Sequence, residues 1–111
     1  MMKDNLVFAL EKGTLRIFII GEIHHHNLAE MREKIDEKIG EFSPEKVVLD
    51  LSQTIISNPF GLKCAVGLII GRHRLLEELQ AELVIENPTP PILKHLQCAG
   101  VDRIIKIVSV K

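Results

Sequence analysis

The chain has 111 residues, of which 46% are hydrophobic and only 4% aromatic, so aliphatic side chains must fill its core. Its 14 basic and 15 acidic residues give a formal charge of -1, without the basic excess that is typical of nucleic-acid-binding proteins. No apolar run approaches the roughly 20 residues that span a bilayer, so we expect no membrane insertion. The length suits a single domain over residues 1–111.

The N-terminal sequence and the cysteine content both favour a cytoplasmic location. Met1–Asn5 lead directly into an apolar strand pattern and lack the architecture of a signal peptide. Cys64 and Cys98 each lie in an apolar helical pattern. We therefore expect two reduced core thiols and no disulfide bond.

The predicted strands form a hairpin and a parallel sheet. Strand patterns occupy residues 6–10, 15–20, 47–51, 83–85 and 104–110. A turn signal at Lys12-Gly13 joins the first two strands into an antiparallel hairpin. Because the later strands alternate with helices, we expect a mixed, mostly parallel sheet.

Three helices are predicted between these strands. The first is amphipathic, has Asn27 as its N-cap and ends at Gly40. The second begins at Pro59 after the N-cap Asn58, because proline loses nothing at the first helical position. The third ends at Gly100. The order is therefore β-β-α-β-α-β-α-β, an α/β fold.

The segment Ser57–Leu62 joins a buried strand pattern to the long second helix. A strand–loop–helix junction exposes backbone N–H groups at the helix N-terminus. Such a place suits an anion, a phosphorylated side chain or a partner protein. This junction is the first candidate for function.

Several short motifs follow one another in a recognisable order and spacing. They are Gly21–Ile23, Val47–Ser52, Gly61-Leu62, Gly67–Arg72, Glu82–Ile85 and Ala99–Ile107. With these motifs the chain resembles the STAS domain of bacterial anti-sigma-factor antagonists over nearly its whole length. The resemblance implies a STAS-like fold and an activity of binding, not catalysis. It also implies an anti-sigma factor or kinase-like regulatory protein as the partner.

The resemblance also implies a switch in the loop before the central helix, which in the family typically reads Asp-Ser-Ser/Ala-Gly-Leu-Gly. The first Ser of that motif is phosphorylated by a partner kinase that is itself an anti-sigma factor, and phosphorylation abolishes binding. Counted without gaps from the strand before it, the motif falls in order on Asn58, Pro59, Phe60, Gly61, Leu62 and Lys63.

The departures from this motif predict that the usual switch is lost. Pro59 has no hydroxyl and cannot accept a phosphoryl group. The acidic residues that commonly flank the phosphorylation site are replaced by Asn58 and His24. Ser57, two residues upstream, is a weak substitute, because the displacement changes the direction and reach of its hydroxyl.

We expect the partner surface to combine the junction with the loop at residues 24–27. The candidate residues are His24, His26, Asn27, Ser57, Asn58, Pro59, Phe60, Gly61, Leu62 and Lys63. Phe60 is the most suggestive of them, and the sequence leaves two alternatives for it. The ring is either an exposed interface anchor or a shield that folds back onto the core.

The remaining polar clusters have plainer interpretations. His24–His26 could supply imidazole ligands, but in an extended chain only His24 and His26 would share a face, so we expect a polar loop and no metal. We expect Asp50 to support the loop that follows it. Both cysteines lie in apolar surroundings, where thiols are inert, so no catalytic residue and no cofactor are predicted.

Two features of the second helix could be structural or functional. Gly67 and Gly71, four residues apart, favour a close approach of the helix to the sheet over small-residue helix packing. The basic run Arg72–Arg74 predicts a solvated face, with binding of an acidic partner or a phosphate as the alternative.

Other functions stay open at this level. The chain could be a small-ligand or nucleotide module that uses the helix start at residues 58–61, although proline removes one amide donor there. It could also be a structural subunit of a larger signalling or transport assembly. A homodimer is compatible with each of these functions.

Overall fold

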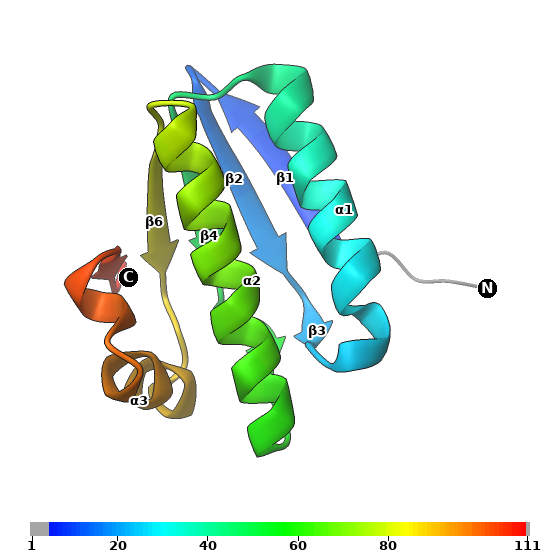
Figure 1. The fold of residues 1–111 in the computed structure, drawn as a ribbon, viewed down its shortest axis with the longest axis vertical. Helices are drawn as coiled ribbons and strands as arrows, with labels where there is room; N and C mark the ends of the chain where they lie inside the picture. Colours follow the sequence, from blue (N-terminus) through cyan, green and yellow to red (C-terminus); the bar gives the residue numbers. More distant parts are fainter. Residues whose placement is uncertain (1–4, 111) are drawn as a thin grey trace.

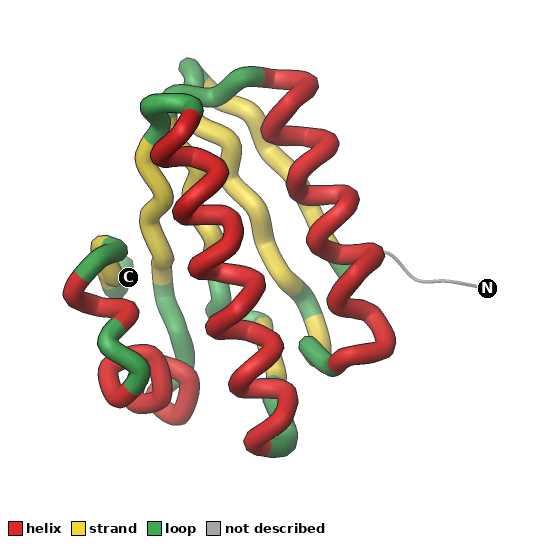
Figure 2. Tube along the Cα trace, viewed as in Figure 1, coloured by secondary structure: helices red, strands yellow, loops and turns green. Residues whose placement is uncertain are grey.

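In the computed structural model, two long helices lie side by side over one face of a five-stranded sheet (Figure 1). Figure 2 shows the strands as a layer behind these helices. The structure describes residues 5–110. Residues 1–4, on which part of the signal-peptide expectation rests, lie outside the described residues. Among the described residues, no helix combines the length and the apolar character needed to span a membrane.

The element order confirms the predicted α/β class and adds short elements. The strands are β1 (Leu6–Glu11), β2 (Thr14–Ile19), β3 (Gly21–Glu22), β4 (Lys46–Asp50), β5 (Thr54–Ile55), β6 (Glu82–Glu86) and β7 (Lys106–Val108). The helices are α1 (His25–Phe42), α2 (Pro59–Glu78), α3 (Pro90–Cys98) and a 3₁₀ turn, Val101–Arg103. The predicted order lacked β3 and β5, and the predicted last strand was too long.

The sheet topology matches the prediction of a hairpin joined to parallel strands. The five strands lie in the order β1-β2-β4-β6-β7, and only the β1–β2 pair is antiparallel. Lys12 and Gly13 form the hairpin turn with φ values of 51° and 82°. Positive φ at both turn residues is the geometry that matches the twist of a hairpin. A separate parallel pair joins β3 to β5.

The core lies between the sheet and the helices α1 and α2. Successive side chains of a strand point to opposite faces, so alternate residues of β2 are buried. The largest fully buried side chains are Leu15, Ile17, Ile19, Ile35, Ile39, Val47, Val48, Leu49, Ile69, Leu76, Ile85 and Leu96. All of them are aliphatic, as the low aromatic content requires. Cys64 is a free thiol at the edge of this core, but Cys98 is exposed, so its predicted core position is wrong.

Helix α1 is longer than predicted at both ends. Its N-cap is His24 and not Asn27, because His24 Nδ1 accepts a hydrogen bond from the backbone N–H of His26 at 3.2 Å. The helix passes through Gly40 and stops at Ser43, whose φ of 45° is left-handed. The Ser43 N–H still donates to the Ile39 carbonyl at 2.9 Å.

On α2, the packing at Gly67 and Gly71 and the burial of Arg72 also differ from expectation. A Cβ atom added at Gly67 or Gly71 would meet nothing within 4 Å, so neither glycine permits a close approach to the sheet. Arg72 is buried instead of solvated, and its Nε lies 2.8 Å from Asp36 Oδ1 on α1. The sequence could not indicate this pairing, because Asp36 and Arg72 meet only in the folded chain.

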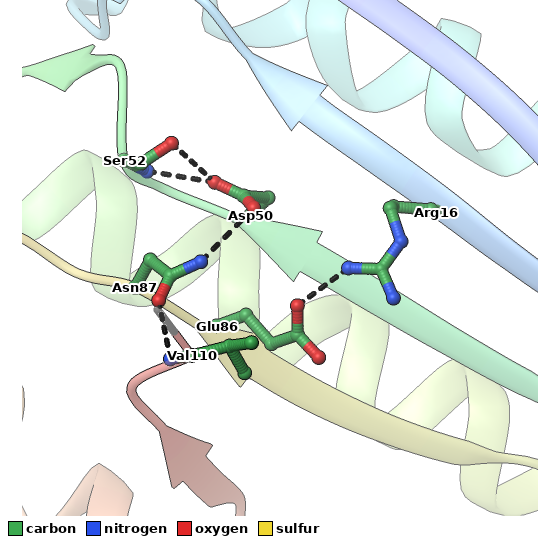
Figure 3. A network of polar contacts seen from close by, with 6 residues as sticks. All are labelled: Arg16, Asp50, Ser52, Glu86, Asn87 and Val110. Carbon is green, nitrogen blue, oxygen red and sulfur yellow. Dashed lines mark hydrogen bonds and ion pairs between the residues drawn. The ribbon is translucent and has the colours of Figure 1, made fainter.

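Asp50 ties together the carboxyl ends of β4 and β6 (Figure 3). Its Oδ1 accepts hydrogen bonds from the Ser52 N–H at 2.9 Å and the Ser52 hydroxyl at 2.6 Å. Its Oδ2 accepts one from Asn87 Nδ2 at 3.3 Å, and Asn87 Oδ1 accepts one from the Val110 N–H at 2.7 Å. Asp50 therefore supports the loop that follows it, as predicted. Beside this network, Arg16 and Glu86 form an ion pair at 2.5 Å (Figure 3).

We predict that Asp50→Ala lowers the free energy of unfolding by about 1–3 kcal/mol, because Ser52 and Asn87 lose their acceptor. Denaturant unfolding monitored by circular dichroism measures the change. Glu82→Ala, at an exposed carboxylate of the neighbouring strand, is the control and should change stability by less than about 0.5 kcal/mol. Equal effects of the two substitutions would contradict the role given to Asp50.

Candidate functional site

The helices α1 and α2 start at the same end of the sheet, where β2 and β4 end (Figure 1). Beyond this edge the chain continues into the short pair β3–β5, in which Gly21 lies opposite Thr54. The buried Thr54 hydroxyl donates to the Ile19 carbonyl at 2.7 Å and so joins the pair to β2. The two helix starts therefore rest on one small, hydrogen-bonded platform.

The start of α2 has the predicted cap. Asn58 is extended, with φ -152° and ψ 164°, and its Oδ1 accepts a hydrogen bond from the Gly61 N–H at 2.8 Å. Pro59 occupies the first helical turn, where its missing N–H costs no intrahelical hydrogen bond. The helix start is thus well defined, with Asn58 as the N-cap and Pro59 in the first turn, as the sequence predicted.

Gly61 lets this helix start approach the platform closely. An added Cβ atom would lie 2.9 Å from the Ile23 carbonyl oxygen and 3.1 Å from Ile56 Cγ2. The first distance is shorter than real Cβ contacts, and the neighbour is backbone, which cannot rotate away. Gly61 is therefore buried, and its close packing positions its neighbours.

The start of α1 is held to the same platform by side chains. Asn27 Oδ1 accepts from the His24 N–H at 3.1 Å, and Asn27 Nδ2 donates to the Glu22 carbonyl at 2.8 Å. The Ser57 hydroxyl donates to the carboxylate of Glu22. Glu22 thereby connects the segments that lead into α1 and α2. Its strand has only two residues, too few to show a strand period in the sequence.

Phe60 is exposed at this edge of the molecule. Its relative exposure is 57%, so the alternative in which the ring folds back onto the core is wrong. The ring packs edge-on against His25 of α1, with 5.5 Å between ring centroids. This contact brings the two segments of the predicted partner surface together.

We call the exposed residues at this edge the junction surface. Its members are His25, His26, Ile55, Ser57, Asn58, Pro59, Phe60 and Lys63. Among the other predicted candidates, Gly61 is buried, and His24, Asn27 and Leu62 are half-buried. His25 and Ile55 were not among the predicted residues. Ile55 is 57% exposed, and an apolar residue between a strand and a proline-containing loop could have indicated it.

The histidine triplet has a structural arrangement that differs from the expected one. The chain is already helical from His25, so His24 and His26 do not alternate as in an extended strand. The rings of His25 and His26 lie 3.9 Å apart, and His24 caps the helix. Within residues 5–110, no three His, Cys, Asp or Glu residues are placed to hold a metal ion.

We predict that Gly61→Ala destabilises the fold by about 1–3 kcal/mol, because the new methyl group would overlap the Ile23 carbonyl. The matched control is Gly67→Ala in the same helix. That methyl group meets open space, so the variant should be more stable by up to about 1 kcal/mol. Thermal and denaturant unfolding measure both changes. A Gly61→Ala variant as stable as Gly67→Ala would contradict the close approach.

Comparison with known sequences identifies relatives of this chain. The model of the STAS domain family matches residues 7–110. An anti-sigma F factor antagonist from Paenibacillus polymyxa is 30% identical over 105 residues, which cover 93% of this chain and 86% of the relative. Another, from Lysinibacillus sphaericus, is 30% identical over 89 residues, which cover 80% of this chain and 73% of the relative.

Comparison with solved structures agrees on the fold. The anti-sigma-factor antagonist SpoIIAA in its unphosphorylated form superposes with a TM-score of 0.79 at 22% identity. The superposition covers 96% of this chain and 88% of that one. The family match extends over nearly all the described residues, and the structural match includes the helices and the mixed sheet. The chain belongs to the STAS domain family.

Proposed function

We propose that this chain is an anti-sigma-factor antagonist, which regulates transcription by binding an anti-sigma factor or kinase-like partner in the cytoplasm. Two relatives named anti-sigma F factor antagonist, each 30% identical to the chain, support this function. The observation that carries the proposed site is the exposure of Phe60 on a helix start that is capped and closely packed. An exposed aromatic side chain on a rigid support is a typical anchor of a protein interface.

We propose further that phosphorylation does not switch this binding. Pro59 occupies the position of the family's phosphorylated Ser and has no hydroxyl. The nearest hydroxyl, that of Ser57, donates its hydrogen bond to the carboxylate of Glu22. A phosphate on Ser57 would bring a charge of about -2 beside that carboxylate, which is unfavourable.

The other hydroxyls near the junction are occupied in the same way. Ser52 donates to Asp50 at 2.6 Å, and Thr54 donates to the Ile19 carbonyl at 2.7 Å. Thr54 is only 3% exposed, so a kinase could not reach it without opening the platform. These contacts favour an antagonist that binds in one permanent state.

A nucleotide or phosphate at the start of α2 is a weaker alternative. Pro59 has no N–H, and the Gly61 N–H already donates to the Asn58 side chain. The helix start therefore lacks the array of free amide donors that anion sites use. The surface is better suited to an apolar and imidazole-rich contact than to a phosphate group.

We predict that Phe60→Ala weakens binding to the anti-sigma factor of the same organism by about 30-fold, which corresponds to about 2 kcal/mol. The melting temperature should stay nearly unchanged, because most of the ring is exposed. Isothermal titration calorimetry with the purified partner measures the affinity, and thermal unfolding measures the stability.

Leu79→Ala provides the matched control for this measurement. Leu79 is 54% exposed and follows the other end of α2, so its truncation removes a similar exposed apolar group far from the junction surface. We expect the affinity of this variant to equal that of the wild type. If Leu79→Ala and Phe60→Ala weaken binding equally, or Phe60→Ala has no effect, the proposed surface is wrong.

A further inference from the structure

A groove of about 340 Å³ lies between α1 and α2, separate from the hydrogen-bonded platform at the helix starts. Its lining comes from two turns of α1 and three turns of α2. The lining residues are Leu28, Arg32, Lys63, Cys64, Gly67, Leu68, Gly71 and Arg72. The volume lies at the lower end of the range of ligand pockets, about 300–1,000 Å³, and therefore suits a small molecule.

The two glycines of α2 create the space. Gly67 and Gly71 lie on the groove, and a Cβ atom at either position would meet nothing within 4 Å. Glycine costs helix stability relative to alanine, and here no close contact requires it. The helices remain packed through other residues, so the opening is part of the folded arrangement of α1 and α2.

Arg72 lines the groove with an unsatisfied guanidinium group. Its side chain is only 9% exposed, and its Nε lies 2.8 Å from Asp36 Oδ1. That contact has the distance of an ion pair but not the angles of a hydrogen bond, and the buried Nη1 has no hydrogen-bond partner among the described residues. A buried donor without an acceptor is unfavourable, and an anionic oxygen at the Arg72 end of the groove would stabilise the charge of this guanidinium group.

The charges around the groove favour an anion. Arg32, Lys63 and Arg72 line it, and within residues 5–110 the carboxylate of Asp36 is the one that pairs with Arg72. Burial lowers the pKa of Arg72, Asp36 raises it, and the nearby positive charge of Arg32 lowers it further. Arg32 and Arg72 line the same groove, and guanidinium groups are well suited to bind an oxyanion.

The apolar residues of the lining indicate which group should be attached to the anion. Leu28, Cys64 and Leu68 provide an apolar wall along the same groove. An inorganic ion would leave this wall in contact with water, whereas an apolar body would cover it. We propose that the groove binds a small amphiphilic anion, with a carboxylate or phosphate head near Arg32 and Arg72 and an apolar chain along the wall.

Calorimetric titration of the full chain tests this site. The probes are octanoate and octyl phosphate, which share a tail and differ in the head group. Octanol has the tail without the charge, and inorganic phosphate and acetate have a charge without the tail. We expect saturable binding below about 1 mM for octanoate, octyl phosphate or both, and at least tenfold weaker binding of octanol, phosphate and acetate. Ligand binding should also raise the melting temperature.

Two variants locate the binding in the groove. Gly67→Leu fills the space, and Arg32→Gln removes an exposed positive charge without leaving a buried partner. Each should weaken octanoate or octyl phosphate binding at least tenfold while the free protein stays as stable as the wild type. The matched controls are Gly40→Leu, at an open helical position outside the groove, and Arg74→Gln, at an exposed arginine. Both controls should bind like the wild type.

Three results would overturn the proposal. The first is that octanol binds as tightly as octanoate. The second is that Gly67→Leu leaves the affinity for octanoate and octyl phosphate unchanged. The third is that no probe saturates below about 1 mM. If the probes fail to bind but Gly67→Leu weakens binding to the anti-sigma factor, the groove receives a side chain of a protein partner and the small-anion site is wrong. The binding of these probes does not depend on Phe60. A failure of the proposed partner contact at Phe60 would therefore leave this test unchanged.

Discussion

The contact between Gly61 and the backbone of Ile23 is the constraint on which the functional edge of the molecule depends. The helix α2 can begin directly against the β3–β5 platform only because position 61 has no Cβ atom. Asn58 then caps the helix by accepting the Gly61 N–H, and the same short segment carries Phe60. The exposed ring reaches His25 because both helix starts rest on this platform. A single backbone approach therefore determines where the candidate partner surface lies.

The polar groups around this constraint favour recognition by a fixed surface. The Ser57 hydroxyl is hydrogen-bonded to Glu22, and the buried Thr54 hydroxyl is hydrogen-bonded within the platform, so each hydroxyl already has an acceptor. By an ungapped count from the preceding strand, the family's phosphate-accepting Ser falls on Pro59, which has no hydroxyl. The exposed surface includes an aromatic ring with imidazole and apolar neighbours, which suits burial against another protein. We therefore associate this edge with constant binding and not with a phosphorylation switch.

Much of the fold could be predicted from the sequence, and the failures have identifiable physical causes. The long strands and helices have clear apolar periods, and Asn58 and Pro59 mark the start of α2 by ordinary capping chemistry. The strands β3 and β5 have two residues each, too few to show any period. The capping role of His24 was missed because imidazole rarely caps a helix. Arg72 looked solvated because its partner Asp36 is adjacent only in the folded chain. The exposure of Phe60 depended on tertiary packing in the same way.

The most direct test is the affinity of the chain for its kinase-like anti-sigma factor. It is measured before and after the chain is incubated with that partner and ATP. Mass spectrometry follows phosphate on Ser52, Thr54 and Ser57 in the same samples. We predict no stoichiometric phosphate on any of them and an affinity that is unchanged within about twofold, or about 0.4 kcal/mol. Stoichiometric phosphate on Ser57 with a tenfold or greater loss of binding would contradict it, because the switch would then have moved along the loop instead of having been lost.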